Sequence, residues 1–201
     1  MLGLMMDRPL LISALIEFAD RYHGDSEIVT QTVEGPVHRY SYADAHRRAR
    51  KAANVLAALG VKPGDRVGTL AWNTYRHFEL YYGISGSGAV CHTVNPRLFE
   101  EQIVYIVNHA EDRVVFFDSS FAALVAQLKT RCPGVQHWVA LVEAGAVPEQ
   151  TPFAQSYEAL LATQTDAFEW PMFDENSASS LCYTSGTTGN PKGVLYSHRS
   201  T

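Results

Sequence analysis

Short apolar stretches alternate with longer helix-like stretches through the middle of the chain, and this alternation constrains the fold more than any other feature. The run Val-Val-Phe-Phe at 114–117 has no polar position, which is typical of a parallel strand buried on both faces. Strands separated by helices indicate a parallel sheet with helices on its faces. We therefore predict an α/β fold with a layered, mainly parallel sheet. The expected strands are 66–71, 89–94, 114–118 and 137–142, and the expected helices are 74–87, 99–110 and one capped by Ser119 or Ser120 that ends before Pro133.

The flanking segments carry local start and stop signals. Ser41 and Asp44 have the spacing of a capping box, which predicts a helix that runs through Leu59 and ends at Gly60. Glu-Gly-Pro at 34–36 predicts the turn of a β-hairpin. The other expected elements are a helix at 9–22 that ends at Gly24, with Leu11, Leu15, Phe18 and Tyr22 on one apolar face; hairpin strands at 27–33 and 37–40; an exposed linker at 143–152; a helix at 153–163; and an aperiodic stretch at 164–176.

Composition argues against several classes of function. A net charge of −5 lacks the basic excess of a nucleic-acid-binding domain. No apolar stretch is long enough to span a bilayer. Cys91, Cys132 and Cys182 are widely spaced and odd in number, which fits neither a disulfide framework nor a zinc site and indicates a reducing cytoplasm. A length of 201 residues is that of one domain.

A loop near the end of the chain contains residue types suited to binding an anion. Residues 183–193 read Tyr-Thr-Ser-Gly-Thr-Thr-Gly-Asn-Pro-Lys-Gly. Glycines let backbone N–H groups approach an anion closely, hydroxyls donate hydrogen bonds, and lysine supplies a mobile positive charge. Strand-like stretches at 179–183 and 194–197 enclose the loop. The pattern indicates a polyphosphate-binding loop between two strands, and it differs from a Walker loop, which needs G-x-x-x-x-G-K-[ST] ahead of a helix.

Four other interpretations compete with a phosphate loop. A Gly/Ser/Thr-rich turn that binds nothing is the simplest. The run Gly-Ser-Gly at 86–88 begins like a dinucleotide fingerprint but follows a helix. Cys91 and His92 with His109 would form a metal site, yet adjacent strand residues point to opposite faces. Ser185 lacks the G-x-S-x-G context of a hydrolase nucleophile. The phosphate loop remains the favoured hypothesis, and no residue is assigned as catalytic.

The loop resembles the phosphate-binding signature of the adenylate-forming (AMP-binding) enzymes, Tyr-Thr-Ser-Gly-Thr-Thr-Gly-x-Pro-Lys-Gly. Trp72-Asn73 and the run at 92–98 look like the medium- and long-chain fatty acyl-CoA synthetases of that superfamily. Such enzymes join a carboxylic acid to AMP, release pyrophosphate, and pass the acyl group to coenzyme A. The resemblance implies that residues 1–201 are the N-terminal portion of the large AMP-binding domain of an acid–thiol ligase in fatty acid metabolism.

The same resemblance implies the cofactors and the site. ATP, Mg²⁺ and CoA are expected, together with a cytoplasmic location and a homodimer contact in the N-terminal region. The Thr184 hydroxyl is expected to help position Mg²⁺. The residues that match the family's phosphate-binding positions are Thr184, Ser185, Gly186, Thr187, Thr188, Gly189 and Lys192.

The printed chain ends at Thr201, whereas members of the resembled family continue well beyond that point. We therefore expect an N-terminal fragment that carries the phosphate loop and cannot turn over by itself. Two other classes stay open. One is a non-catalytic phosphate-binding, nucleotide-binding or dimerisation module. The other is a P-loop NTPase or kinase, which the loop spacing disfavours.

Overall fold

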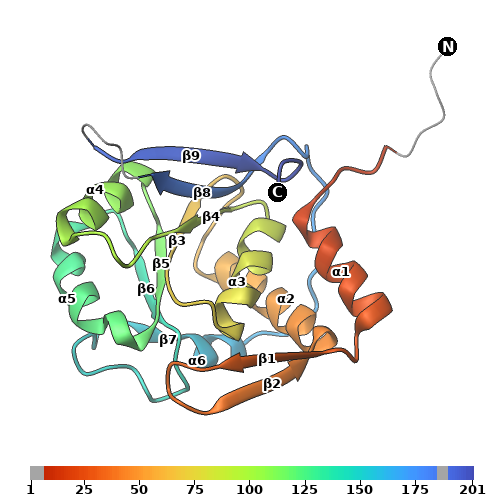
Figure 1. The fold of residues 1–201 in the computed structure, drawn as a ribbon, viewed down its shortest axis with the longest axis horizontal. Helices are drawn as coiled ribbons and strands as arrows, with labels where there is room; N and C mark the ends of the chain where they lie inside the picture. Colours follow the sequence, from red (N-terminus) through yellow and green to blue (C-terminus); the bar gives the residue numbers. More distant parts are fainter. Residues whose placement is uncertain (1–6, 185–189) are drawn as a thin grey trace.

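A seven-stranded sheet runs through the protein in the computed structural model, which describes residues 7–184 and 190–201 (Figure 1). The strand order is β7-β6-β5-β3-β4-β8-β9, and every neighbouring pair is parallel except β8 and β9. The predicted α/β fold with a mainly parallel sheet is confirmed. The strands are β3 (Arg66–Leu70), β4 (Val90–Thr93), β5 (Val114–Phe117), β6 (His137–Ala140), β7 (Gln155–Ser156), β8 (Ala178–Thr184) and β9 (Lys192–Ser197).

Helices cover both faces of this sheet (Figure 1). One apolar cluster joins the sheet to α2, α3 and α6, and a second joins it to α4 and α5. Among the described helices, none has the length and apolar character needed to cross a membrane. The helices are α1 (Ile12–His23), α2 (Tyr42–Ala58), α3 (Tyr75–Gly86), α4 (Glu100–Ala110), α5 (Ala122–Arg131) and α6 (Tyr157–Ala162), with a 3-10 turn, η1 (Ser119–Phe121), before α5.

The central strand β5 shows why the sequence folds in this way. Val115 and Phe117 pack with α4 and α5, whereas Val114 and Phe116 pack with α2, α3 and α6. Successive side chains of a strand point to opposite faces, so a strand covered on both sides needs four apolar residues in a row. All four are almost completely buried, and each contributes about 1.5–3 kcal/mol of burial free energy.

The N-terminal hairpin and its capping box form as predicted. β1 (Glu27–Gln31) pairs antiparallel with β2 (Val37–Ser41). The Ser41 Oγ accepts a hydrogen bond from the Asp44 N–H at 3.2 Å, and the Asp44 carboxylate accepts one from the Ser41 N–H at 3.1 Å. α2 starts directly after this box, and Gly60 has a φ of +79°, which stops the helix.

The helix predicted at 153–163 is wrong over its first part. Gln155 and Ser156 form the short edge strand β7, which pairs with Val139 and Ala140 of β6. The helix begins only at Tyr157, where the Ser156 Oγ accepts a hydrogen bond from the Ala159 N–H at 3.2 Å. Pairing with a distant strand therefore outweighs the local helical pattern before Tyr157.

The predicted side-chain cap of α5 is also wrong. Ser119 and Ser120 lie in η1 and do not cap α5, which follows Phe121 without a side-chain cap. α1 ends at Gly24 as predicted, and this glycine has a right-handed φ of −53°. The predicted apolar face of α1 is largely uncovered, since Leu15, Phe18 and Tyr22 are 58, 56 and 62% exposed. The helix buries Ser13 and Ile16 in their place.

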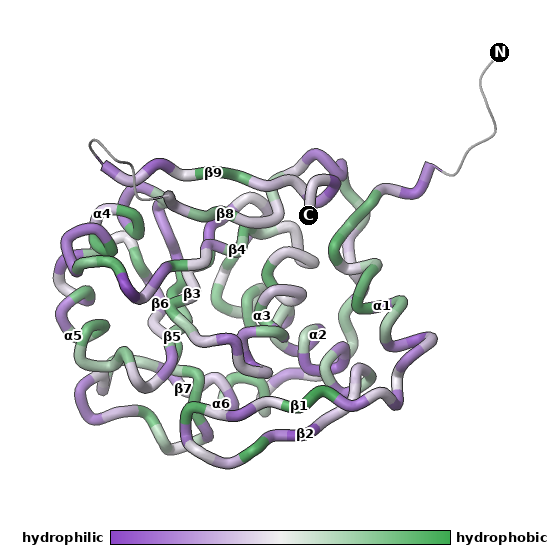
Figure 2. The backbone as a smooth tube through the Cα atoms, viewed as in Figure 1, coloured by the Kyte–Doolittle hydropathy of each residue, from purple (hydrophilic) through white to green (hydrophobic). Residues whose placement is uncertain are grey.

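β9 is the edge strand next to β8. The middle of this strand is hydrophobic (Figure 2), yet Val194, Leu195 and Tyr196 are all exposed. An edge strand with exposed apolar side chains is a surface on which a further strand or chain can pack.

Candidate phosphate-binding site

The predicted loop connects two paired strands. β8 and β9 are antiparallel, with Thr184 opposite Lys192 and Tyr183 opposite Gly193. A Walker loop would be followed by a helix, whereas a strand follows here, so the predicted strand–loop–strand arrangement is confirmed for the flanks. The predicted phosphate-binding residues that lie outside the described residues are Ser185, Gly186, Thr187, Thr188 and Gly189.

The end of β8 lies at the edge of the sheet where α/β proteins bind ligands. β8 runs parallel to β4, with Cys182 beside Thr93 and 3.3 Å between the Thr93 Oγ1 and the Cys182 Sγ. Thr184 therefore stands at the carboxyl end of a parallel strand. Ligands of open α/β sheets bind outside these carboxyl ends.

Thr184 and Lys192 are the predicted site residues that the structure describes. The Thr184 hydroxyl donates to the main-chain oxygen of Lys192 at 3.5 Å, and both residues are exposed. A hydroxyl and an ammonium on facing strands are suitable donors to phosphate oxygens. A hydroxyl oxygen also suits Mg²⁺, which takes few protein ligands and completes its shell with water and phosphate. Within residues 7–184 and 190–201, no group of three His, Cys, Asp or Glu residues is placed to hold a metal ion.

Behind the strand end, Tyr183 contacts two histidines that sequence reasoning did not connect with it. Its hydroxyl lies 2.6 Å from the Nδ1 of His109 at the end of α4. Its ring centroid lies 5.2 Å from that of His92. The Nδ1 of His92 is in turn 2.7 Å from a carboxylate oxygen of Asp112, and this pair is fully buried. No short-range pattern in the sequence marks these contacts.

The structure agrees with the sequence argument against a metal site at Cys91 and His92. Cys91 is packed in the cluster that contains α2 and α3. His92 pairs with Asp112 and lies against Tyr183, which belongs to the cluster on the α4 side. The two side chains therefore point to opposite faces of β4.

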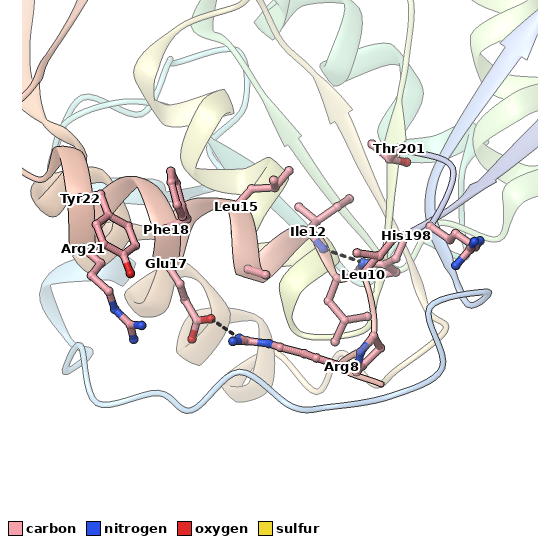
Figure 3. A pocket seen from close by; sticks show the side chains of 14 residues that line it. Arg8, Leu10, Ile12, Leu15, Glu17, Phe18, Arg21, Tyr22, His198 and Thr201 are labelled. Carbon is pink, nitrogen blue, oxygen red and sulfur yellow. Dashed lines mark hydrogen bonds and ion pairs between the residues drawn. The ribbon is translucent and has the colours of Figure 1, made fainter. Parts of the chain in front are cut away.

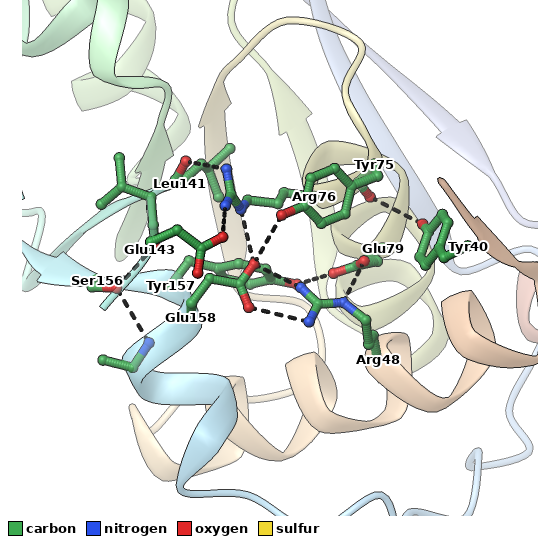
Figure 4. Close-up of polar contacts among 12 residues, drawn as sticks. Tyr40, Arg48, Tyr75, Arg76, Glu79, Leu141, Glu143, Ser156, Tyr157 and Glu158 are labelled. Atoms are coloured by element: carbon green, nitrogen blue, oxygen red, sulfur yellow. Dashed lines mark hydrogen bonds and ion pairs between the residues drawn. The ribbon is translucent and has the colours of Figure 1, made fainter. Parts of the chain in front are cut away.

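A second group of polar side chains links the helices α2, α3 and α6 (Figure 4). Arg76 of α3 donates to Glu158 of α6 at 2.9 Å, to the Leu141 main-chain oxygen at 2.9 Å, and to Glu34 and Glu143 at 2.7 Å each. Arg48 of α2 donates to both oxygens of the Glu158 carboxylate, at 2.8 Å to Oε1 and 3.1 Å to Oε2. Glu158 therefore joins α2, α3 and α6.

Glu79 completes this group and is fully buried. It accepts hydrogen bonds from the Arg48 Nε at 2.7 Å and the Tyr157 hydroxyl at 2.9 Å. Burial raises the pKa of Glu79 to about 7. Burial alone would also raise the pKa of Glu158, but its hydrogen bonds to Arg48 and Arg76 and their charges outweigh burial and hold it below its usual value. Because these carboxylates are held by protein partners, we assign them to the fold and not to catalysis.

A groove lies beside α1, away from the loop (Figure 3). It has a volume of about 540 Å³ and is lined by Leu15, Phe18 and Tyr22 of α1 and by His198 and Thr201. β9 begins at Lys192 beside the loop and ends at Ser197, next to this groove, so five residues of extended chain, roughly 17 Å, separate the two places. The groove is distinct from the candidate phosphate site.

A family model described as "AMP-binding enzyme" matches residues 16–201 of this chain. The chain belongs to the AMP-binding enzyme family. This confirms the family that the loop motif indicated. The matched range includes every described strand and helix from β1 to β9.

Curated relatives of this AMP-binding family member are acyl-CoA ligases. It is 55% identical over 202 residues to a 3-methylmercaptopropionyl-CoA ligase of Ruegeria lacuscaerulensis, covering 100% of this chain and 38% of the relative. It is 50% identical to a medium-chain-fatty-acid–CoA ligase of Ectopseudomonas oleovorans, covering 100% of this chain and 37% of that protein. A long-chain-fatty-acid–CoA ligase of Thermus thermophilus is 44% identical over 97% of this chain and 35% of its own length. The chain thus spans somewhat more than a third of these relatives.

Solved structures show the same fold. The anthranilate CoA ligase AuaEII in complex with anthranoyl-AMP superposes with a TM-score of 0.83 at 24% identity, over 96% of this chain and 36% of that one. A fatty acyl CoA synthetase of Mycobacterium tuberculosis gives a TM-score of 0.74 at 23% identity, over 94% of this chain and 35% of that one. The predicted acyl-CoA synthetase fold is confirmed.

Proposed function

We propose that residues 1–201 are the N-terminal portion of the large domain of an AMP-forming acyl-CoA ligase in the cytoplasm. Such an enzyme activates a carboxylic acid with ATP as an acyl-adenylate and transfers the acyl group to CoA. The supporting observation is the position of Thr184 and Lys192 on facing strands at the carboxyl end of β8, in a chain 50–55% identical to acyl-CoA ligases. The names of those relatives favour an aliphatic or thioether-containing acid as substrate.

In this proposal the loop holds the leaving pyrophosphate. Attack of the carboxylate on the α-phosphorus builds negative charge on the β- and γ-phosphates. The Lys192 ammonium places a positive charge beside the oxygens of these phosphates, and the Thr184 hydroxyl donates a hydrogen bond to one of them. The remaining members of the set are Ser185, Gly186, Thr187, Thr188 and Gly189. Thr184 is also the proposed protein ligand of Mg²⁺, which when bound offsets phosphate charge.

Titration calorimetry of the 201-residue chain with Mg²⁺-pyrophosphate and with Mg²⁺-ATP tests the phosphate site. Lys192→Ala removes a charge-assisted hydrogen bond of about 1.5–3 kcal/mol, so we expect the Kd to rise about 10- to 100-fold. Lys62→Ala is the matched control, because Lys62 lies in the turn after α2 and its side chain makes no hydrogen bond or ion pair among the described residues. Failure of the wild-type chain to bind either ligand would refute the phosphate site.

A separate assay tests the proposal that the 201-residue chain cannot turn over. We expect no ATP–pyrophosphate exchange with hexanoate or 3-methylmercaptopropionate as the acid. The reason is that the chain covers only 37–38% of the length of the acyl-CoA ligases to which it is 50–55% identical. Robust exchange by the purified chain would contradict this part of the proposal.

A second candidate function, a dimerisation module, is favoured by one observation. β9 is an edge strand with the apolar side chains of Leu195 and Tyr196 exposed, and such an edge can pair with a second copy. Light scattering decides between the two oligomeric states, since a dimer has twice the 22.2 kDa mass of one chain. If a dimer forms through β9, Leu195→Lys should dissociate it, whereas a monomer at all concentrations rules this candidate out.

A further inference from the structure

Tyr183 is the described residue that connects the proposed phosphate site to the rest of the fold most directly. It precedes Thr184 in β8 and lies opposite Gly193, which follows Lys192 in β9. It is therefore adjacent to both described site residues, one along its own strand and one across the hairpin.

The ring of Tyr183 lies against the backbone of β9. A Cβ added to Gly193 would come within 3.2 Å of the Tyr183 Cζ and 3.4 Å of its hydroxyl oxygen. Real Cβ atoms rarely approach other atoms this closely. The glycine at 193 thus makes room for the ring.

The hydroxyl of Tyr183 is anchored to α4. Burial raises the pKa of Tyr183, so the phenol keeps its proton near neutral pH, and its hydroxyl is hydrogen-bonded to the His109 Nδ1 at 2.6 Å. His109 is itself stacked on Tyr105, one turn earlier in α4, with 5.3 Å between ring centroids and an interplanar angle of 25°. Both partners of this hydrogen bond therefore pack against a neighbour, Tyr183 against Gly193 and His109 against Tyr105.

The same ring also lies against a fully buried pair of side chains. His92 of β4 lies 5.2 Å from it, ring to ring. The fully buried Asp112 binds His92 at 2.7 Å and packs so closely over β3 that a Cβ on Gly68 would lie 3.0 Å from its carboxylate. Breaking this buried hydrogen bond would leave further unpaired polar atoms beside the His92 Nε2 and the Asp112 Oδ1, which already lack a partner among the described residues, so the pair favours one geometry.

We propose that Tyr183 is a positioning residue for the phosphate site: its hydrogen bond to His109 and its packing on Gly193 hold Thr184 and Lys192 at facing positions. The effect of Tyr183 on phosphate binding rests on the proposed function. The effect of Tyr183 on the β8–β9 hairpin is independent of that function. Tyr183 touches no phosphate itself and acts through its two neighbours.

Backbone amide exchange, followed by ¹⁵N NMR of the 22.2 kDa chain, measures the hairpin directly. We expect Tyr183→Phe, which keeps the ring and removes the hydroxyl, to accelerate exchange about fivefold or more at residues 181–184 and 192–195 only. His109→Leu should do the same. His109→Gln should restore slow exchange, since its amide oxygen can accept the hydrogen bond. Tyr22→Phe, at an exposed position on α1, is the matched control and should change nothing at the hairpin.

Pyrophosphate titration of the same variants completes the test. In a wild-type chain that binds, Tyr183→Phe should raise the Kd about three- to tenfold, and His109→Gln should leave it near the wild-type value. Exchange in Tyr183→Phe that is within twofold of wild type, or that rises equally across the whole sheet, overturns the inference. So does an unchanged Kd in a chain that binds. If the wild-type chain binds no pyrophosphate but the hairpin exchange pattern appears, the proposed function fails and the positioning of the hairpin by Tyr183 stands.

Discussion

Replacing Arg76 with methionine tests how much the buried ion-pair group stabilises the fold. Arg76 is only 4% exposed, and its guanidinium is the shared partner of Glu34, Glu143 and Glu158. Methionine keeps the apolar stem and removes the five N–H donors. The substitution therefore probes the polar contacts and not the packing of the side chain.

The expected loss of stability is about 3–5 kcal/mol, the range for breaking a buried ion pair by removing one partner. Glu143 contributes little to it, because its side chain is largely exposed. The main costs come from Glu158, which keeps Arg48 as its remaining cation, and from the main-chain oxygen of buried Leu141, which loses the Arg76 donor. With a urea m value of about 1–3 kcal/mol per M, the unfolding midpoint should fall by at least about 1 M.

Arg39→Met is the matched control for this experiment. Arg39 of β2 pairs with Glu27 of β1 at 2.6 Å, which is as short as the ion pairs of Arg76. The Arg39 side chain, however, is 60% exposed. Exposed pairs contribute at most about 1 kcal/mol. Urea unfolding followed by circular dichroism compares the two variants. Equal losses for Arg76→Met and Arg39→Met would refute the reasoning, since burial is the difference on which it depends.

Two further predictions concern buried positions of α3. Burial lowers the pKa of His77 to about 4, so the unfolded chain takes up a proton below its usual pKa of about 6.5 and the folded chain does not. Proton uptake by the unfolded chain therefore lowers the free energy of unfolding as the pH falls from 6.5 to 4, by about 3 kcal/mol, and it has no effect above pH 6.5. His77→Gln should flatten that part of a plot of unfolding free energy against pH relative to His23→Gln, and parallel curves would contradict the assignment. Gly83→Ala should cost about 1–3 kcal/mol, because the new Cβ would lie 2.9 Å from the Ala52 Cβ and 3.2 Å from the Ala49 oxygen of α2. Gly134→Ala, where a Cβ meets nothing within 4 Å, should leave the thermal midpoint unchanged, and equal midpoints for both variants would exclude a close approach of α2 and α3 at this point.

Features that depend on neighbours in the sequence were predictable. The Ser41–Asp44 capping box involves residues three apart, and α2 begins where it predicts. The all-apolar strand β5 follows from the period of two in a strand that is covered on both sides. The antiparallel flanks of the phosphate loop are also local, because β8 and β9 are joined by the loop itself.

Features that depend on distant partners were missed. The start of α6 was wrong because Gln155 and Ser156 pair with β6, and no pattern within 153–163 reports that pairing. The apolar stripe of α1 has helical spacing, yet the helix packs through Ser13 and Ile16, since the orientation of a helix is set by what it packs against. The outcome is an apolar face whose Leu15, Phe18 and Tyr22 side chains are exposed.

The candidate site divides in the same way. The sequence by itself determined the motif, the strand on each side of it and the family, because glycine conformations, hydroxyl donors and a lysine charge are properties of residues that are close along the chain. Only the tertiary structure decided that β8 lies beside β4 with its carboxyl end at the ligand-binding edge, that His109 meets Tyr183 across 74 residues, and that Arg48 meets Glu158 across 110. The physical reason is the distance along the chain between the residues that interact. Capping and strand alternation act over a few residues, whereas ion pairs, buried hydrogen bonds and strand order form between segments whose approach no local pattern encodes.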